Sequence, residues 1–220
     1  MSDSNFNRTE SLTYADLSQT VKASYGSGYV QGAKSQERLC IPGEPWCKTS
    51  LVIYDGKEQS CNEICADLSM IYVTKQSGLG SLMCDGILGL SPTNQNDPDM
   101  DLFIEQAYAQ GSIPEKVFSL SIGPGSKPSS ITFGGYDLET FATGDIKWHP
   151  TIKDQHWEVG LSGFSVGDTK VPISMNKTLV DSGTSYISMP QSEFYALYQE
   201  LKLNQTCFKS SFGGTEIIFC

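Results

Sequence analysis

Short apolar or alternating runs recur along the chain, and Gly, Pro, Asn and Asp residues separate them. This pattern predicts β-strands joined by tight turns, and therefore a mainly β fold whose strands are mostly antiparallel. The expected strands are residues 21–25, 51–54, 68–74, 117–122, 130–133, 145–149, 157–161, 164–166 and 178–180. Residues 123–128 are rich in Gly, Pro and Ser, and we expect them to form a linker or the tip of a hairpin.

Two segments have helical rather than strand-like spacing. Residues 100–110 carry a broad apolar face and end at Gly111, which is a typical stop for a helix. A second helix is expected over residues 190–203, where apolar side chains recur three or four positions apart: Phe194, Leu197, Tyr198 and Leu201. We interpret both helices as elements that pack on a sheet rather than as binding sites.

The 220-residue chain is acidic, with 15 Lys and Arg residues against 25 Asp and Glu residues and a net charge of −10. Nucleic acids and anionic membranes attract basic surfaces, so this composition argues against both as partners. No apolar run approaches the length of a membrane-spanning helix. The acidity fits a protein that works in an acidic compartment, but solubility alone would explain it as well.

Four of the seven cysteines lie in one charged segment, residues 38–67, and they are Cys40, Cys47, Cys61 and Cys65. We interpret this segment as a loop insertion held by disulfides. A zinc site is the alternative. The only histidines, His149 and His156, lie far along the chain, and the spacing of the cysteines matches no paired zinc motif. The prediction is therefore disulfides and no metal.

The remaining cysteines and three sequons bear on the cellular compartment in which the protein works. Cys207 and Cys220 could bridge a short hairpin, which leaves Cys84 either free and buried or without its partner. Sequons of the form Asn-x-Thr agree with a secretory route, and they begin at Asn7, Asn176 and Asn204. Residues 1–20 are polar and contain no signal peptide. We therefore expect a secreted protein whose front end is missing.

An apolar run leads directly into Asp181, inside a turn of small polar residues. Gly183 permits a tight turn that a side chain would block. The hydroxyl groups of Ser182, Thr184 and Ser185, with nearby backbone amides, could donate hydrogen bonds that hold the carboxylate ionised. An alternating, strand-like pattern resumes after the turn. A carboxylate presented in this way suits acid–base work on water, although Asp-Ser-Gly is also an ordinary turn sequence.

Four motifs follow one another along the chain: a glycine-rich hairpin at residues 23–32, Cys-Asp-Gly-Ile-Leu-Gly-Leu at 84–90, Phe-Gly-Gly-Tyr-Asp at 133–137 and Val-Asp-Ser-Gly-Thr-Ser at 180–185. Together they resemble the pepsin-like aspartic proteases, peptidase family A1. The resemblance implies a mainly β, bilobal acid protease fold with a few short helices, here incomplete in both lobes. Residues 1–123 would form a partial N-terminal lobe, with a flap at about 23–32 and the Cys-rich insertion at about 38–67. Residues 124–220 would form a partial C-terminal lobe.

The resemblance also implies roles for individual residues. Asp181 matches the catalytic Asp of the second lobe, and Thr184 matches a threonine whose hydroxyl ties the two active-site loops together. Tyr25 matches the flap tyrosine, and residues 87–89 match a stretch that packs beneath the active-site loop of the first lobe. The implied substrate-binding residues are Tyr25, Gly26, Ser27, Gly183, Thr184 and Ser185.

In this family two carboxyls share a proton, so that at acid pH one acts as a base on water and the other as an acid on the peptide carbonyl. The resemblance implies a peptide or protein substrate, no cofactor, a monomer in the complete protein, and a secreted or lysosomal (vacuolar) location. The chain holds no second Asp-Thr-Gly or Asp-Ser-Gly motif, so it supplies only the second catalytic Asp. We therefore expect an interior segment of a longer aspartic endopeptidase.

Two other functions stay open. A catalytically dead binding or inhibitory protein could use the same fold, with the first Asp replaced in the full-length chain. A homodimer in which each chain supplies one Asp is the other, but the chain does not look built for symmetry. A Gly-x-Ser-x-Gly motif at residues 163–167 has no histidine downstream, and the glycines of residues 26–32 have the wrong spacing for a dinucleotide-binding loop.

Overall fold

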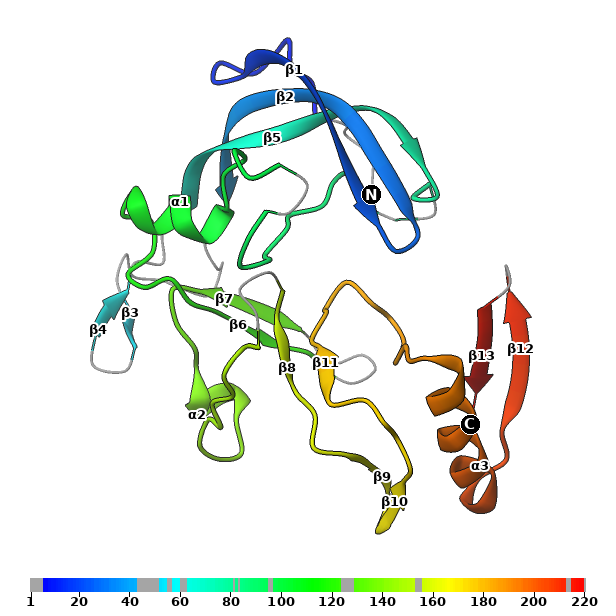
Figure 1. Ribbon diagram of the computed structural model, residues 1–220. Helices are drawn as coiled ribbons and strands as arrows, with labels where there is room; N and C mark the ends of the chain where they lie inside the picture. The colour runs from blue at the N-terminus through cyan, green and yellow to red at the C-terminus, as the bar shows by residue number, and fades with distance from the viewer. Residues whose placement is uncertain are drawn as a thin grey trace. The chain divides into compact units, whose positions relative to one another are not determined.

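The computed structural model describes residues 6–42, 52–54, 57–59, 63–80, 82, 84–94, 97–123, 129–152, 156–212 and 215–219 (Figure 1). Strands dominate its regular structure and the helices are few and short, which confirms the predicted mainly β class. The chain divides into two compact units, Met1–Lys147 and Trp148–Cys220, and each unit is described by itself below.

The first unit is built on a three-stranded antiparallel sheet in the order β1 (Ala15–Tyr25), β2 (Gly28–Ile41) and β5 (Ile64–Ser77) (Figure 1). Strands β1 and β5 are longer than the apolar runs that predicted them, and β2 was predicted only to residue 32, as part of the hairpin at 23–32. Hydrogen bonding to a neighbour, not hydrophobicity, extends β1 backwards from Val21, because the polar residues before it still pair with β2. The register shifts between Asp16 and Gln19, where Ser18 has a positive φ of 57°.

One helix covers part of this sheet and completes its core. Helix α1 (Phe103–Ala109) begins a few residues later than predicted and ends before Gly111, whose φ of 76° confirms the predicted glycine stop. Phe103 is 2% exposed, and its ring meets that of Phe133 edge to face at 5.3 Å. The buried apolar cluster consists of Ala66, Leu68, Phe103, Ala107, Ile113 and Phe133.

Two short strand pairs also lie in the first unit. Strands β6 (Phe118–Ser121) and β7 (Ser130–Phe133) pair with each other in antiparallel fashion. Strands β3 (Val52–Tyr54) and β4 (Lys57–Gln59) form a second hairpin in the Cys-rich segment. Both hairpins belong to the unit that ends at Lys147. The lobe boundary at residues 123/124 stays a prediction.

The described residues of the second unit form three strand pairs and one 14-residue helix. Strand β8 (Glu158–Gly160) pairs with β11 (Lys177–Leu179), β9 (Phe164–Val166) with β10 (Thr169–Val171), and β12 (Phe208–Phe212) with β13 (Thr215–Phe219). Helix α3 (Gln191–Asn204) contacts β9 and β10, and Leu197 of the helix and Val171 of β10 are buried. The helix predicted from the spacing of apolar residues is therefore confirmed.

Two sequence-based expectations for the backbone are wrong, and one helix was not predicted. Residues 145–149 form no strand, because none of the described strands pairs with them and a lone extended segment leaves its backbone groups to water. Residues 186–190, expected to be strand-like, form no strand. Helix α2 (Leu138–Phe141) was not predicted, although Asp137 caps it by accepting a hydrogen bond from the backbone N–H of Thr140 at 2.9 Å.

The Cys40–Cys65 disulfide confirms the expected cross-link in the Cys-rich segment. The two cysteines face each other in the register of β2 and β5, so the ends of this segment are continuous strands rather than an inserted loop. Cys207 is also disulfide-bonded. Cys47, Cys61 and Cys220 lie outside the described residues. Cys84 is free and exposed, so the expectation that it is buried if free is wrong.

Candidate active site

Asp181 lies in a turn just after β11, where the apolar run ends. Its Oδ1 atom accepts a hydrogen bond from the backbone N–H of Gly183 at 2.8 Å, and its Oδ2 atom accepts one from the hydroxyl of Thr184 at 2.5 Å. A Cβ at Gly183 would lie 3.1 Å from Oδ1, so a side chain there would push the carboxylate by a few tenths of an ångström. One hydrogen bond to each oxygen fixes the rotation of the carboxylate.

Only some of the predicted hydrogen-bond donors to the Asp181 carboxylate are therefore present. The Thr184 hydroxyl and one backbone amide donate to the carboxylate as expected, whereas no hydrogen bond from Ser182 or Ser185 to Asp181 occurs among the described residues. Because the Thr184 hydroxyl is directed at Asp181 itself, the tie between two active-site loops that we expected from it stays a prediction.

The turn is exposed and has apolar neighbours. Asp181 and the residues that follow it are exposed in the second unit. Val180 is 62% exposed on one side of the turn, and Ile187 is 73% exposed on the other. Exposed apolar groups on both sides of a polar turn are what an extended peptide or another segment of polypeptide could cover.

The strand before Asp181 is braced by the strand beside it. The backbone N–H of Val180 donates to the carbonyl of Trp157 at 2.9 Å, which extends the β8–β11 pairing to the residue before Asp181. Lys177 on β11 forms an ion pair with Glu158 on β8 at 3.1 Å. The pairing of Glu158 with Lys177 was not predicted, because an ion pair between residues so far apart in the sequence is visible only once the strands are paired.

The glycine-rich segment around Tyr25 forms the predicted hairpin. Strands β1 and β2 are joined at Gly26 and Ser27, and Tyr25 pairs with Gly28. Tyr25 is 41% exposed at the end of β1, and burial raises the pKa of its phenol above the usual 10.0. A Cβ at Gly26 would meet nothing within 4 Å, so the tip of the hairpin is open.

The segment that should pack beneath an active-site loop has no regular structure over residues 86–90. Ile87 is 50% exposed and Leu88 is 37% exposed, whereas Leu90 packs against the core of the first unit. The packing role expected for residues 87–89 therefore stays a prediction. Tyr25, Gly26 and Ser27 belong to the first unit, and Asp181, Gly183, Thr184 and Ser185 belong to the second.

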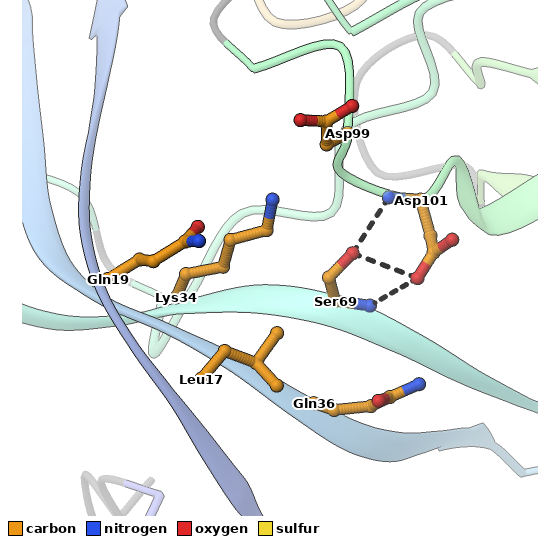
Figure 2. Close-up of a pocket in the computed structure, with 7 residues that line it drawn as sticks. All are labelled: Leu17, Gln19, Lys34, Gln36, Ser69, Asp99 and Asp101. Carbon is orange, nitrogen blue, oxygen red and sulfur yellow. Dashed lines mark hydrogen bonds between the residues drawn. The ribbon is translucent and has the colours of Figure 1, made fainter.

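The first unit also contains a polar pocket (Figure 2). None of the predicted site residues lines it, and its lining consists of Leu17, Gln19, Lys34, Gln36, Ser69, Asp99 and Asp101. Several of these groups already have partners. Asp101 accepts hydrogen bonds from the backbone N–H and the hydroxyl of Ser69, both at 2.8 Å (Figure 2), and Lys34 forms an ion pair with Asp97 at 2.8 Å. We interpret these contacts as a tie between β5 and the segment before α1.

Comparison with protein families identifies the chain. The family model "Eukaryotic aspartyl protease" matches residues 1–212. The chain belongs to this family. This confirms the resemblance inferred from the four motifs, and it covers both the Tyr25 hairpin and the Asp181 turn.

Individual relatives in the aspartyl protease family agree with the family match. Human gastricsin is 27% identical over 202 residues, which are 90% of this chain and 47% of gastricsin. Mouse cathepsin E is 28% identical over 200 residues, covering 89% of this chain and 46% of the relative. Pepsin A of Suncus murinus is 23% identical over 221 residues, covering 98% and 50%. The chain therefore spans about half the length of the curated relatives it matches.

Proposed function

We propose that this chain supplies one catalytic carboxylate, Asp181, to an aspartic endopeptidase that hydrolyses peptide bonds with water. The observation that carries the proposal is the Asp181 turn, in which each carboxylate oxygen accepts one hydrogen bond, in a chain of the aspartyl protease family. The second carboxyl of the pair is not assigned to any residue of this chain.

The chemistry follows from two carboxyls that share one proton. The ionised carboxyl removes a proton from water as the water oxygen attacks the peptide carbonyl carbon, and the protonated carboxyl donates its proton to the carbonyl oxygen. Collapse of the tetrahedral intermediate breaks the C–N bond, and the amine leaves with a proton. In this scheme the hydrogen bonds from Gly183 and Thr184 fix the orientation of the Asp181 carboxylate during attack.

The hairpin that carries Tyr25 would act as a flap over the substrate in this scheme. Its support is the open tip at Gly26, where a Cβ would meet no atom within 4 Å, so that a peptide could approach the backbone N–H groups that Gly26 and Ser27 would offer. A flap that closes over an extended peptide excludes water and fixes the scissile bond relative to the carboxyls. The substrate is therefore a peptide or protein bound in an extended conformation, and Gly183, Thr184 and Ser185 would contact it from the other side.

We place the protein in a secreted or lysosomal (vacuolar) compartment and expect it to act as a monomer. The support for this location is the Cys40–Cys65 disulfide, because such cross-links form and persist in oxidising compartments. Among the described residues no helix is long and apolar enough to cross a membrane.

The test is the turnover of Asp181→Asn in protein expressed from its complete reading frame, with a mixture of unrelated peptides as substrate at acid pH. We expect kcat/KM to fall by about 10²–10⁴-fold while the fold is retained, because the isosteric amide cannot exchange protons. Asp137→Asn is the matched control, since it removes another turn carboxylate that caps α2 and should leave kcat/KM near the wild-type value. Full activity in Asp181→Asn would refute the proposal.

The same experiment separates the alternatives. A wild-type protein that binds peptides but cleaves none at any pH would favour a binding or inhibitory function. Activity of the isolated 220-residue chain that rises with the square of its concentration would favour a dimer in which each chain supplies one Asp.

A further inference from the structure

The three sequons of the chain differ in local structure, and Asn7 stands at the start of an exposed turn. We propose that Asn7 is a site of N-linked glycosylation. Asn7, Arg8 and Thr9 are all exposed, and the turn begins at Arg8. The modification needs passage of the chain through a lumen that contains the oligosaccharyl transferase, which the proposed location supplies, and it does not depend on catalysis.

The side chains of the acceptor and the hydroxyl residue are already side by side in this turn. The Oδ1 atom of Asn7 accepts hydrogen bonds from the backbone N–H of Thr9 at 3.1 Å and from its hydroxyl at 2.7 Å. The turn is closed by the backbone N–H of Glu10, which donates to the carbonyl of Asn7 at 3.1 Å. Because the transferase requires both residues of the sequon, a turn that presents them together is suited to carry the modification.

The neighbours of Asn7 anchor the turn while Asn7 itself stays exposed. The ring of Phe6 lies 6.1 Å from that of Tyr14 and 6.3 Å from that of Tyr72. On the other side, the guanidinium of Arg8 lies 4.9 Å above the ring of Tyr72. The turn is therefore fixed against the sheet of the first unit by both flanking side chains, and a glycan on Asn7 would extend from a defined position on this unit.

The other two sequons have regular structure. Asn176 is exposed, but its carbonyl accepts a hydrogen bond from the backbone N–H of Leu161 at 2.9 Å, and the residues that follow it belong to β11. Lys177, its middle residue, is held by the ion pair with Glu158. Asn204 is the last residue of α3. Neither sequon forms the compact turn seen at Asn7.

The donor of the sugar chain is a lipid-linked oligosaccharyl diphosphate, and the acceptor is the side-chain amide of Asn7. The bond between the anomeric carbon of the sugar and the diphosphate oxygen breaks, and a bond forms between that carbon and Nδ2 of Asn7. The lipid diphosphate is the leaving group, and Nδ2 loses one proton to a base of the transferase. In the unmodified chain Nδ2 donates one hydrogen bond to Glu10 at 2.8 Å, so its other proton is available.

The test is translation of the whole 220-residue chain, behind a cleavable leader, into the lumen of microsomes. Glycosylation is detected by a mobility shift that an endoglycosidase removes, and peptide mass spectrometry after deglycosylation in heavy-oxygen water locates the modified Asn. We expect the label on Asn7, its loss in Asn7→Gln and Thr9→Ala, and its retention in Thr9→Ser. Asn176→Gln is the matched control and should leave the label on Asn7 unchanged.

A second measurement tests whether the glycan is accessible in the folded chain. Because Asn7 is exposed, the endoglycosidase should remove this glycan without denaturant as completely as with it. A leader-cleaved chain that carries no label on Asn7 would overturn the proposal, and so would a glycan that is released only after denaturation. A glycosylated protein without peptidase activity would instead count against the proposed function alone.

Discussion

The carboxylate of Glu37 is buried in the middle of β2, yet it is held in its ionised form. Burial by itself raises the pKa of this group, but hydrogen bonds from Ser11, Thr13 and the backbone N–H of Arg38 outweigh it, so that the pKa lies below the ordinary 4.5. A lowered pKa in the folded state contributes stability above pH 4.5, and this contribution is lost as the pH falls through the folded-state pKa.

We therefore predict a pH-dependent effect of Glu37→Gln. At neutral pH the free energy of unfolding should fall by about 1–2 kcal/mol, because an amide accepts these hydrogen bonds more weakly than a carboxylate. The deficit should shrink as the pH is lowered, since the wild-type carboxylate then becomes protonated. Urea unfolding at a series of pH values measures it, with the exposed Glu63→Gln as control. A deficit that stays constant down to acid pH would contradict the assigned ionisation.

Some residues of the candidate site could be predicted from the sequence, and others could not. Asp181, Gly183 and Thr184 could be found because their roles depend on neighbours within the same turn. Glu37 could not be found, because its donors at Ser11 and Thr13 come from a separate segment that only the folded first unit brings to β2. The exposure of Asp181 was likewise not predictable, since it depends on what covers the turn.

At the scale of elements, the Tyr25 hairpin depends on a close approach between β2 and β5. A Cβ at Gly28 would lie 1.9 Å from the carbonyl oxygen of Ser77, whereas a Cβ at Gly26 would meet no atom within 4 Å. The two glycines of one turn therefore have different functions. Gly28 allows the sheet to form, and Gly26 leaves the tip open.

This difference predicts opposite outcomes for two small substitutions. Gly28→Ala should lower the free energy of unfolding by about 1–3 kcal/mol, because the strands must move apart to admit the methyl group. Gly26→Ala should change it by no more than about 0.5 kcal/mol. Urea unfolding of the two variants gives the comparison. Equal effects of the two substitutions would show that the hairpin does not pair with β5 in this register.

The Cys40–Cys65 disulfide joins the end of β2 to the start of β5, and the two cysteines lie 25 residues apart in the sequence. We predict that Cys40→Ser combined with Cys65→Ser lowers the free energy of unfolding by about 3 kcal/mol, mainly because the unfolded chain becomes less restricted. Cys84→Ser is the control and should have little effect, since this cysteine is free and exposed. Urea unfolding without reductant is the measurement, and equal stability of the double variant and wild type would contradict the prediction.

Elements with a strong local signal were predictable, and those that depend on pairing were not. Helix α3 and the Tyr25 hairpin could be predicted from apolar spacing and from a glycine-rich turn between two strand-like runs. The polar first half of β1 carries no such signal and exists because β2 pairs with it. Residues 145–149 carry the signal of a strand but have no described partner strand, so the prediction was wrong there.

At the scale of the whole molecule, the chain contains two compact units and spans about half the length of its curated relatives. The sequence motifs were sufficient to predict membership of the aspartyl protease family, because each motif has its own local chemistry and their order is specific. The proposed reaction, in contrast, requires two carboxyls at one place, and this chain contributes one Asp-Ser-Gly turn. The central claim is therefore that Asp181 is one member of an acid–base pair.

The pH dependence of kcat/KM tests this claim most directly, measured for peptide cleavage by protein expressed from its complete reading frame. Two coupled carboxyls predict a bell-shaped profile with both limbs in the acid range, because the pair is active only while it holds a single proton. We expect this profile in the wild type and in Asp137→Asn, and its loss in Asp181→Asn. A rate that rises steadily toward neutral pH, or an unchanged bell in Asp181→Asn, would contradict the account.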